Sequence, residues 1–125
     1  MPNELFGAYW LDQVVAKGAL VPSHWSSEVG NVLLFAERSQ RISSDQRHKA
    51  LHTLRELPIT IDTLTSHHAW LETADLAERY NLPLYDASYL ELALRRSLPL
   101  ATFDKALKHA AKKAGTLIFP LRVSS

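Results

Sequence analysis

Residues 98–107 read Leu98-Pro-Leu-Ala-Thr-Phe-Asp-Lys-Ala-Leu107 and contain both kinds of element from which the domain is expected to be built. The apolar run at 98–102 predicts a short strand. Asp104 follows it and predicts the N-cap of a helix that ends at Gly115. The sequence therefore predicts a strand that leads through a short turn into a helix, with a carboxylate at the junction.

The same alternation of strand and helix runs along the whole chain, and no linker, repeat or low-complexity tract interrupts it. Strands separated by helices imply a parallel sheet covered by helices, so the predicted fold class is α/β, a three-layer α/β/α domain with a short parallel sheet of four strands. The predicted strands are 19–21, 59–61, 98–102 and 116–119. The predicted helices are 4–17, 23–40, 43–57, 65–80, 86–97 and 104–115, with Ser23, Ser43 or Ser44, Thr65, Asp86 and Asp104 at their N-termini.

Length and composition bound the class of protein. A chain of 125 residues has the size of one domain with a real core, and its apolar fraction of 46% is that of a soluble globular protein. No apolar run is long enough to cross a bilayer, and no signal sequence opens the chain. The absence of cysteine excludes disulfides and thiolate metal sites. These features predict a cytoplasmic protein that has no membrane partner.

The net charge of +1 hides an uneven distribution. Residues 93–125 have a balance of +6, and residues 1–92 have a balance of −5. A basic end points modestly to a polyanionic partner, although lysines on a solvated helix are the commoner explanation.

Three carboxylates are candidates for chemistry: Glu28, Asp86 and Asp104. On a helical wheel Glu28 falls among apolar residues, where a carboxylate is costly unless it is paired or coordinated. Asp86 and Asp104 begin predicted helices near the carboxyl ends of strands, where ligands gather in parallel sheets. Helix capping alone also explains these two residues, and a buried ion pair with an arginine would explain Glu28.

If the three acids converge, their mutual repulsion needs a cation, and hard divalent ions such as Mg²⁺ or Mn²⁺ prefer oxygen ligands. Asn31 lies beside Glu28 on its helix, and Thr102 is two residues before Asp104. We expect these two side chains to orient the acids, with ordinary surface polarity as the alternative.

Lys105, Lys108 and Lys112 share one face of the helix that follows Asp104. A basic stripe beside an acidic metal site suits a nuclease that holds a phosphate backbone. His48 and His52 have the spacing of a zinc pair but lack a third ligand, so we expect them to be solvent-exposed. The tryptophans Trp10, Trp25 and Trp70 are expected to anchor the core rather than to stack on bases.

Taken together, three segments of the chain resemble PIN-domain ribonucleases, specifically the VapC-type toxins of toxin–antitoxin pairs. Residues 18–34 are similar to the strand and helix that bear the family's second acid, at Glu28. Residues 84–93 resemble the segment that bears the third, at Asp86, and residues 98–107 the strand and turn that bear the fourth, at Asp104. The resemblance covers nearly the whole chain as a single PIN-like domain, residues 1–125.

This resemblance implies an endoribonuclease that uses Mg²⁺ or Mn²⁺, hydrolyses RNA phosphodiesters with metal-activated water, and is inhibited by a VapB-type antitoxin. It implies catalytic and metal-binding roles for Glu28, Asp86 and Asp104. It also implies a homodimer. The alternative is a catalytically impaired PIN-like domain that binds an antitoxin or RNA without cleaving it.

The chain departs from the family pattern at its start. Such proteins normally open with a strand that ends in the first metal-binding Asp, whereas this chain begins Met1-Pro-Asn-Glu4. By resemblance, that strand lies in the middle of the sheet, so its absence would leave two strand pairs. We therefore expect a domain truncated at its N-terminus relative to the family, and a dimer in the folded form.

Overall fold

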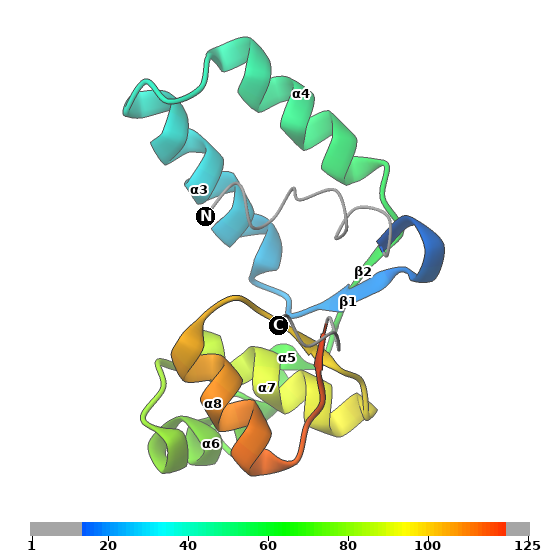
Figure 1. Ribbon diagram of the computed structural model, residues 1–125, viewed down its shortest axis with the longest axis vertical. Helices are drawn as coiled ribbons and strands as arrows, with labels where there is room; N and C mark the ends of the chain where they lie inside the picture. Colours follow the sequence, from blue (N-terminus) through cyan, green and yellow to red (C-terminus); the bar gives the residue numbers. More distant parts are fainter. Residues whose placement is uncertain (1–13, 120–125) are drawn as a thin grey trace, which may run out of the picture. The chain divides into compact units, whose positions relative to one another are not determined.

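The computed structural model describes residues 14–119 (Figure 1). Its contacts divide the chain into two compact units, unit 1 up to Ile61 and unit 2 from Asp62 onward. We describe each unit by itself. Over the described range, no helix combines the length and the apolar character that a membrane crossing requires.

Unit 1 is built on two short strands, β1 (Ala19–Val21) and β2 (Ile59–Ile61), which pair in parallel with Ala19 opposite Ile59. Before β1, residues 14–17 are helical and end at Gly18, whose φ is +77°. A Cβ at Gly18 would lie 3.1 Å from the carbonyl oxygen of Pro58, so this position also needs glycine for the close approach of the backbone. The predicted strands 19–21 and 59–61 are confirmed.

After β1, the described part of unit 1 contains the helices α3 (Trp25–Arg38) and α4 (Ser44–Arg55). The cap predicted for α3 at Ser23 is wrong, because the N-cap residue is His24, which makes no side-chain capping bond. The cap of α4 is Ser43, whose hydroxyl accepts from the Gln46 N–H while the Gln46 side chain accepts from the Ser43 N–H. This reciprocal pair is a capping box, which resolves the choice between Ser43 and Ser44.

Between Asp62 and Phe119, unit 2 contains four helices and a second parallel strand pair, in which Leu100 lies opposite Ile118. Over residues 14–119, the four predicted strands thus form two pairs rather than one sheet, as the resemblance led us to expect. The elements are α5 (Thr65–His68), α6 (Glu72–Tyr80), α7 (Leu84–Arg96), β3 (Leu100–Ala101), α8 (Lys105–Ala114) and β4 (Ile118–Phe119).

The hydrophobic core of unit 2 lies between α7 and α8 and extends to β3. Leu90 and Ala87 of α7 are fully buried, and Leu107 and Ala110 of α8 are nearly so. Small alanines on both helices allow their backbones to approach closely. The remaining buried members of this cluster are Leu82, Ala93, Leu100 and Ala111.

Three sequence expectations for unit 2 are wrong. The single helix predicted at 65–80 is two helices, because Leu71 has a non-helical conformation with φ −118° and ψ −97°. Asp86 is not a cap, because α7 begins two residues earlier at Leu84, after Pro83. Trp70 is 89% exposed and anchors no core. Trp25 is half-buried, and Trp10 lies outside the described residues.

Candidate active site

Asp104 occupies the junction between β3 and α8. Its carboxylate Oδ2 accepts a hydrogen bond of 2.8 Å from the Leu107 N–H, so it caps α8 as predicted. The backbone N–H of Asp104 donates to the Thr102 hydroxyl at 3.0 Å. Thr102 therefore fixes the backbone of Asp104, while Leu107 holds its carboxylate. The side chain is exposed, and capping uses only one of its two oxygens.

Asp86 lies in the first turn of α7 and is half-buried. A helix N-terminus carries partial positive charge from its unpaired N–H groups, which favours a carboxylate there. The next two residues, Ala87 and Ser88, are buried. The position therefore belongs to the border between the core of unit 2 and its surface.

Glu28 lies on α3 immediately before the buried Val29. Its side chain is 39% exposed, and its Oε1 is 3.1 Å from Nδ1 of His24, one turn earlier. Glu28 is thus at the edge of the apolar face of α3, and it contacts His24. Asn31, which was expected to orient it, is exposed.

The three acids belong to different parts of the molecule. Glu28 lies in unit 1, and Asp86 and Asp104 lie in unit 2. In neither unit do the described residues include a group of three or more His, Asp and Glu side chains arranged to hold a metal ion. A centre that uses all three acids therefore requires both units, and it stays a prediction.

The basic helix α8 buries Leu107, Ala110 and Ala111 against the core of unit 2. Lys105 and Lys112 are exposed, and Lys108 is half-buried. The ammonium group of Lys108 lies 5.7 Å from the ring centre of Phe103. Lys108 therefore lies beside the residue that precedes Asp104, and Lys105 and Lys112 are on the same helix.

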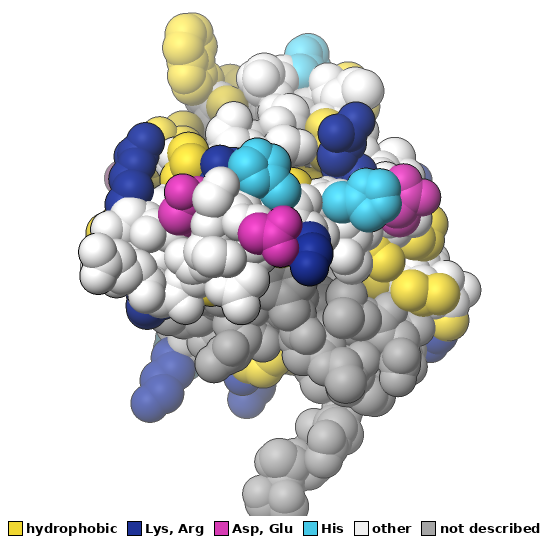
Figure 2. Space-filling model, turned by 90° about the horizontal axis from the view of Figure 1, so that it is seen from above, with side chains coloured by type: hydrophobic (Ala, Val, Ile, Leu, Met, Phe, Trp, Pro, Cys, Tyr) yellow, Lys and Arg dark blue, Asp and Glu magenta, His cyan; other side chains and the backbone are white. Residues whose placement is uncertain are grey.

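The histidines of α4 are exposed, as expected. Nδ1 of His48 lies 2.8 Å from the Ser44 carbonyl oxygen, one turn back on the same helix. Figure 2 shows acidic, basic and histidine side chains interspersed on the face that it presents, rather than a field of one sign. Such mixed surfaces are typical of solvated helices.

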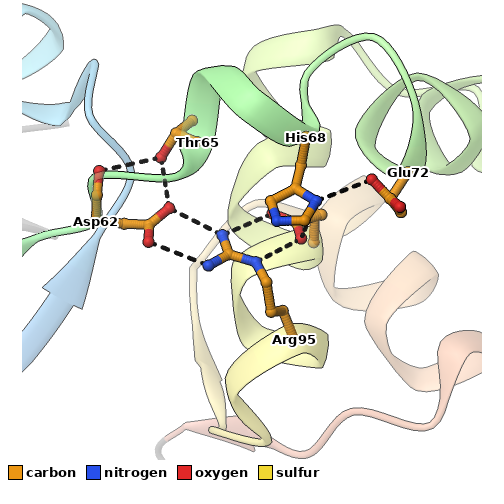
Figure 3. Close-up of polar contacts among 6 residues, drawn as sticks. Asp62, Thr65, His68, Glu72 and Arg95 are labelled. Atoms are coloured by element: carbon orange, nitrogen blue, oxygen red, sulfur yellow. Dashed lines mark hydrogen bonds and ion pairs between the residues drawn. The ribbon is translucent and has the colours of Figure 1, made fainter.

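Unit 2 contains a buried charged cluster that was not predicted from the sequence (Figure 3). It joins Asp62, just after β2, to Glu91 and Arg95 of α7. The Arg95 guanidinium donates to both oxygens of Asp62, at 3.1 and 2.8 Å, and to both oxygens of Glu91, at 2.7 and 3.0 Å. Thr65 adds a hydroxyl bond of 2.8 Å to Asp62. One arginine thus neutralises part of the charge of two carboxylates that are only 5% and 4% exposed.

The pKa values of the cluster follow from these contacts. The hydrogen bonds from Arg95, opposed by desolvation and helped by Thr65, lower the pKa of Asp62 to about 2. Hydrogen bonds to Glu91, which have the largest effect, and to Asp62 raise the pKa of Arg95 above its ordinary value. The i to i+4 spacing of Glu91 and Arg95 was visible in the sequence. Asp62 is 33 residues from Arg95, so no local pattern could have paired them.

His68 borders the same cluster. Its Nδ1 lies 2.9 Å from Oε1 of Glu72 and 3.9 Å from Oε2 of Glu91. The hydrogen bond with His68 lowers the pKa of the exposed Glu72. The cluster thereby connects Asp62, at the start of unit 2, with α5, α6 and α7, and it braces the helix that bears Asp86.

Residues 7–113 match the family model described as PIN domain, a range that includes Glu28, Asp86 and Asp104. The chain is 36% identical over 89 residues to two proteins called Ribonuclease VapC1, from Mycobacterium tuberculosis strains CDC 1551 / Oshkosh and ATCC 25618 / H37Rv. The aligned part is 71% of this chain and 65% of each relative, so the chain spans less than two thirds of their length.

No solved structure matches this chain. The family match confirms the predicted fold class, since the PIN domain is the three-layer α/β/α fold expected from the alternation of helices and parallel strands. The chain belongs to the PIN-domain family.

Proposed function

We propose that this chain is an endoribonuclease of the VapC type, the toxin of a toxin–antitoxin pair. The observation that carries the proposal is the PIN-domain match over residues 7–113 together with 36% identity to the relatives named Ribonuclease VapC1. The partners that follow are an RNA substrate, a VapB-type antitoxin and a second copy of the chain. A cytoplasmic location follows from such a substrate.

The side chains present suit a hard divalent cation, Mg²⁺ or Mn²⁺, because all three candidate ligands are carboxylates. Capping leaves Asp104 with a second oxygen, and Glu28 is partly exposed. In this proposal Glu28 and Asp86 are direct ligands, and Asp104 acts more peripherally through water. When bound, such an ion would lower the pKa of a water molecule and stabilise charge that develops on phosphate oxygens.

The protein's own groups position the substrate. Lys105, Lys108 and Lys112 attract the phosphate backbone toward the β3–α8 turn. The Thr102 hydroxyl keeps the backbone at Asp104 fixed, and Asn31 is positioned one turn from Glu28. These groups would hold the phosphodiester in line for attack by water, and the bound ion would supply activation of the water and stabilisation of the developing charge.

The test is cleavage of single-stranded RNA with Mg²⁺ or Mn²⁺. We expect that cleavage is lost in EDTA, because EDTA removes the metal ion. We expect the same loss in Asp86→Asn, because this substitution removes the charge of a proposed metal ligand. Asp45→Asn, at an exposed acid of α4, is the matched control and should cleave like the unchanged protein.

Cleavage that persists in Asp86→Asn with excess EDTA would contradict the mechanism. A second measurement separates catalysis from binding alone. If the ligands assemble, millimolar Mg²⁺ raises the unfolding midpoint of the unchanged protein more than that of Asp86→Asn. An equal response in the two proteins favours a PIN-like domain that binds RNA or antitoxin without cleaving it.

A further inference from the structure

Phe103 immediately precedes Asp104 in the turn between β3 and α8, and 44% of its side chain is exposed. The backbone on either side of it is fixed, because the Asp104 N–H donates to Thr102 and the Leu107 N–H donates to Asp104. An aromatic ring is therefore held at the surface, one residue from a candidate catalytic acid.

Local structure explains part of this arrangement. Asp104 is the N-cap of α8, so Phe103 is the residue before the cap and Lys108 is the fourth residue of the helix. These are the two positions of a hydrophobic staple, and the stem of Lys108 can pack there. The ammonium group 5.7 Å from the ring centre adds a cation–π contact. A staple needs only an apolar side chain, so it does not explain an exposed aromatic ring.

The charges around the ring indicate what it faces. Lys105 and Lys112 are exposed on the same helix as Lys108, and the last 33 residues of the chain have a charge balance of +6, whereas the residues before them have −5. A surface that combines lysines with an exposed aromatic ring is complementary to single-stranded nucleic acid, whose phosphates bind the cations and whose bases stack on the ring.

We propose that Phe103 stacks on a base next to the cleaved phosphodiester and that Lys108 contacts the adjoining phosphate. This inference rests on the proposed function, since it assumes that RNA is the substrate. Because Phe103 and Asp104 are adjacent residues, a base stacked on the ring holds its own phosphate beside the acid. Phe103 is thus a positioning residue for the substrate.

A stacking contact at Phe103 also determines which form of RNA the site would bind. In a duplex, both faces of each base are covered by neighbouring bases, so a protein ring can stack only on an unpaired, splayed base. We therefore expect the site to select unpaired RNA, with little preference among the four bases, because each has a flat face for stacking.

The first experiment measures binding by fluorescence anisotropy, in EDTA so that no cleavage occurs. The probe is a labelled single-stranded RNA of about 12 nucleotides. We expect Phe103→Ala and Phe103→Leu to weaken binding about 5- to 100-fold, the cost of one lost base–aromatic stack, and Phe103→Tyr to bind like the unchanged protein. Leucine keeps the staple contact, so its loss of binding separates stacking from helix capping.

Leu117→Ala is the matched control, because Leu117 is an apolar residue of unit 2 that is 64% exposed. It should leave binding unchanged. The annealed duplex of the same RNA should bind the unchanged protein and Phe103→Leu equally. Equal binding of single-stranded RNA by Phe103→Leu and the unchanged protein would overturn the proposal.

A second experiment detects the stacked base directly. All nucleotides of the probe are replaced by abasic residues, because RNA that binds without base preference can shift when only one base is removed. Stacking predicts that removal of the bases weakens binding to the unchanged protein but not to Phe103→Ala. A purely structural role predicts equal losses in both proteins, and that result would refute stacking.

The two proposals fail separately. Coupling between Phe103 and the bases, without any metal-dependent cleavage, would refute the nuclease function and keep the stacking site. Metal-dependent cleavage with the same kcat/KM in Phe103→Leu and the unchanged protein would keep the nuclease function and refute the stacking site.

Discussion

Helices α4 and α7 have almost the same length, 12 and 13 residues, but different sources of stability. Helix α4 buries none of its residues, and it has a capping box, a partly exposed ion pair with Glu37 of α3 and an exposed ion pair within the helix. Helix α7 buries six residues and has an arginine bound to two buried carboxylates. The first helix is specified by local sequence, and the second by its tertiary environment.

The largest expected effect is at Arg95. Arg95→Ala leaves Asp62 and Glu91 buried without their cation, and we expect a loss of about 3–5 kcal/mol in the free energy of unfolding. The measurement is urea denaturation at pH 7. The matched control is Arg47→Ala, which breaks the pair of α4 with Glu37 at partly exposed side chains and should cost less than about 1 kcal/mol. Equal losses would remove the distinction between the two helices.

The pH dependence of stability tests the same cluster. The pKa of Asp62 is lowered from 3.8 to about 2, so its charge stabilises the folded state above pH 4. This contribution, about 2 kcal/mol, is lost as the pH falls from 4 toward 2. The stability difference between the unchanged protein and Asp62→Asn should therefore shrink over that range. A stability difference that stays constant between pH 4 and pH 2 would contradict this contribution of Asp62. So would an NMR titration in which the Asp62 carboxyl has a pKa near 4.

The smallest expected effect is at the cap of α4. Ser43→Ala removes the hydroxyl that accepts from the Gln46 N–H, and it should lower the free energy of unfolding by about 1 kcal/mol. Ser44→Ala is the control, because Ser44 is already inside the helix and alanine is favourable there. The urea midpoints of the two variants give the comparison. A larger loss of stability in Ser44→Ala than in Ser43→Ala would show that Ser43 is not the cap.

Much of unit 2 was visible in the sequence. The Asp104 cap, the Gly115 end of α8 and the end of α6 at Tyr80 were all predicted. Gly115 and Asn81, which follow these two helices, have positive φ angles of +86° and +54°. The break at Leu71 was not predicted, because apolar periodicity continues across it and no glycine or proline marks it. The start of α7 was placed two residues late, because Asp86 has the chemistry of a cap without its position.

The candidate site divides in the same way. Sequence alone selected Glu28, Asp86, Asp104 and the lysines of α8, because caps, strand ends and family motifs are local patterns. By itself it also determined the order of helices and strands, since each depends on neighbours within a few turns of chain.

Only the tertiary structure revealed the contact of Glu28 with His24, the exposure of Phe103 and Trp70, and the ion cluster around Arg95. Burial and long-range pairing depend on which distant segments pack together, and a pattern of neighbouring residues does not contain that information.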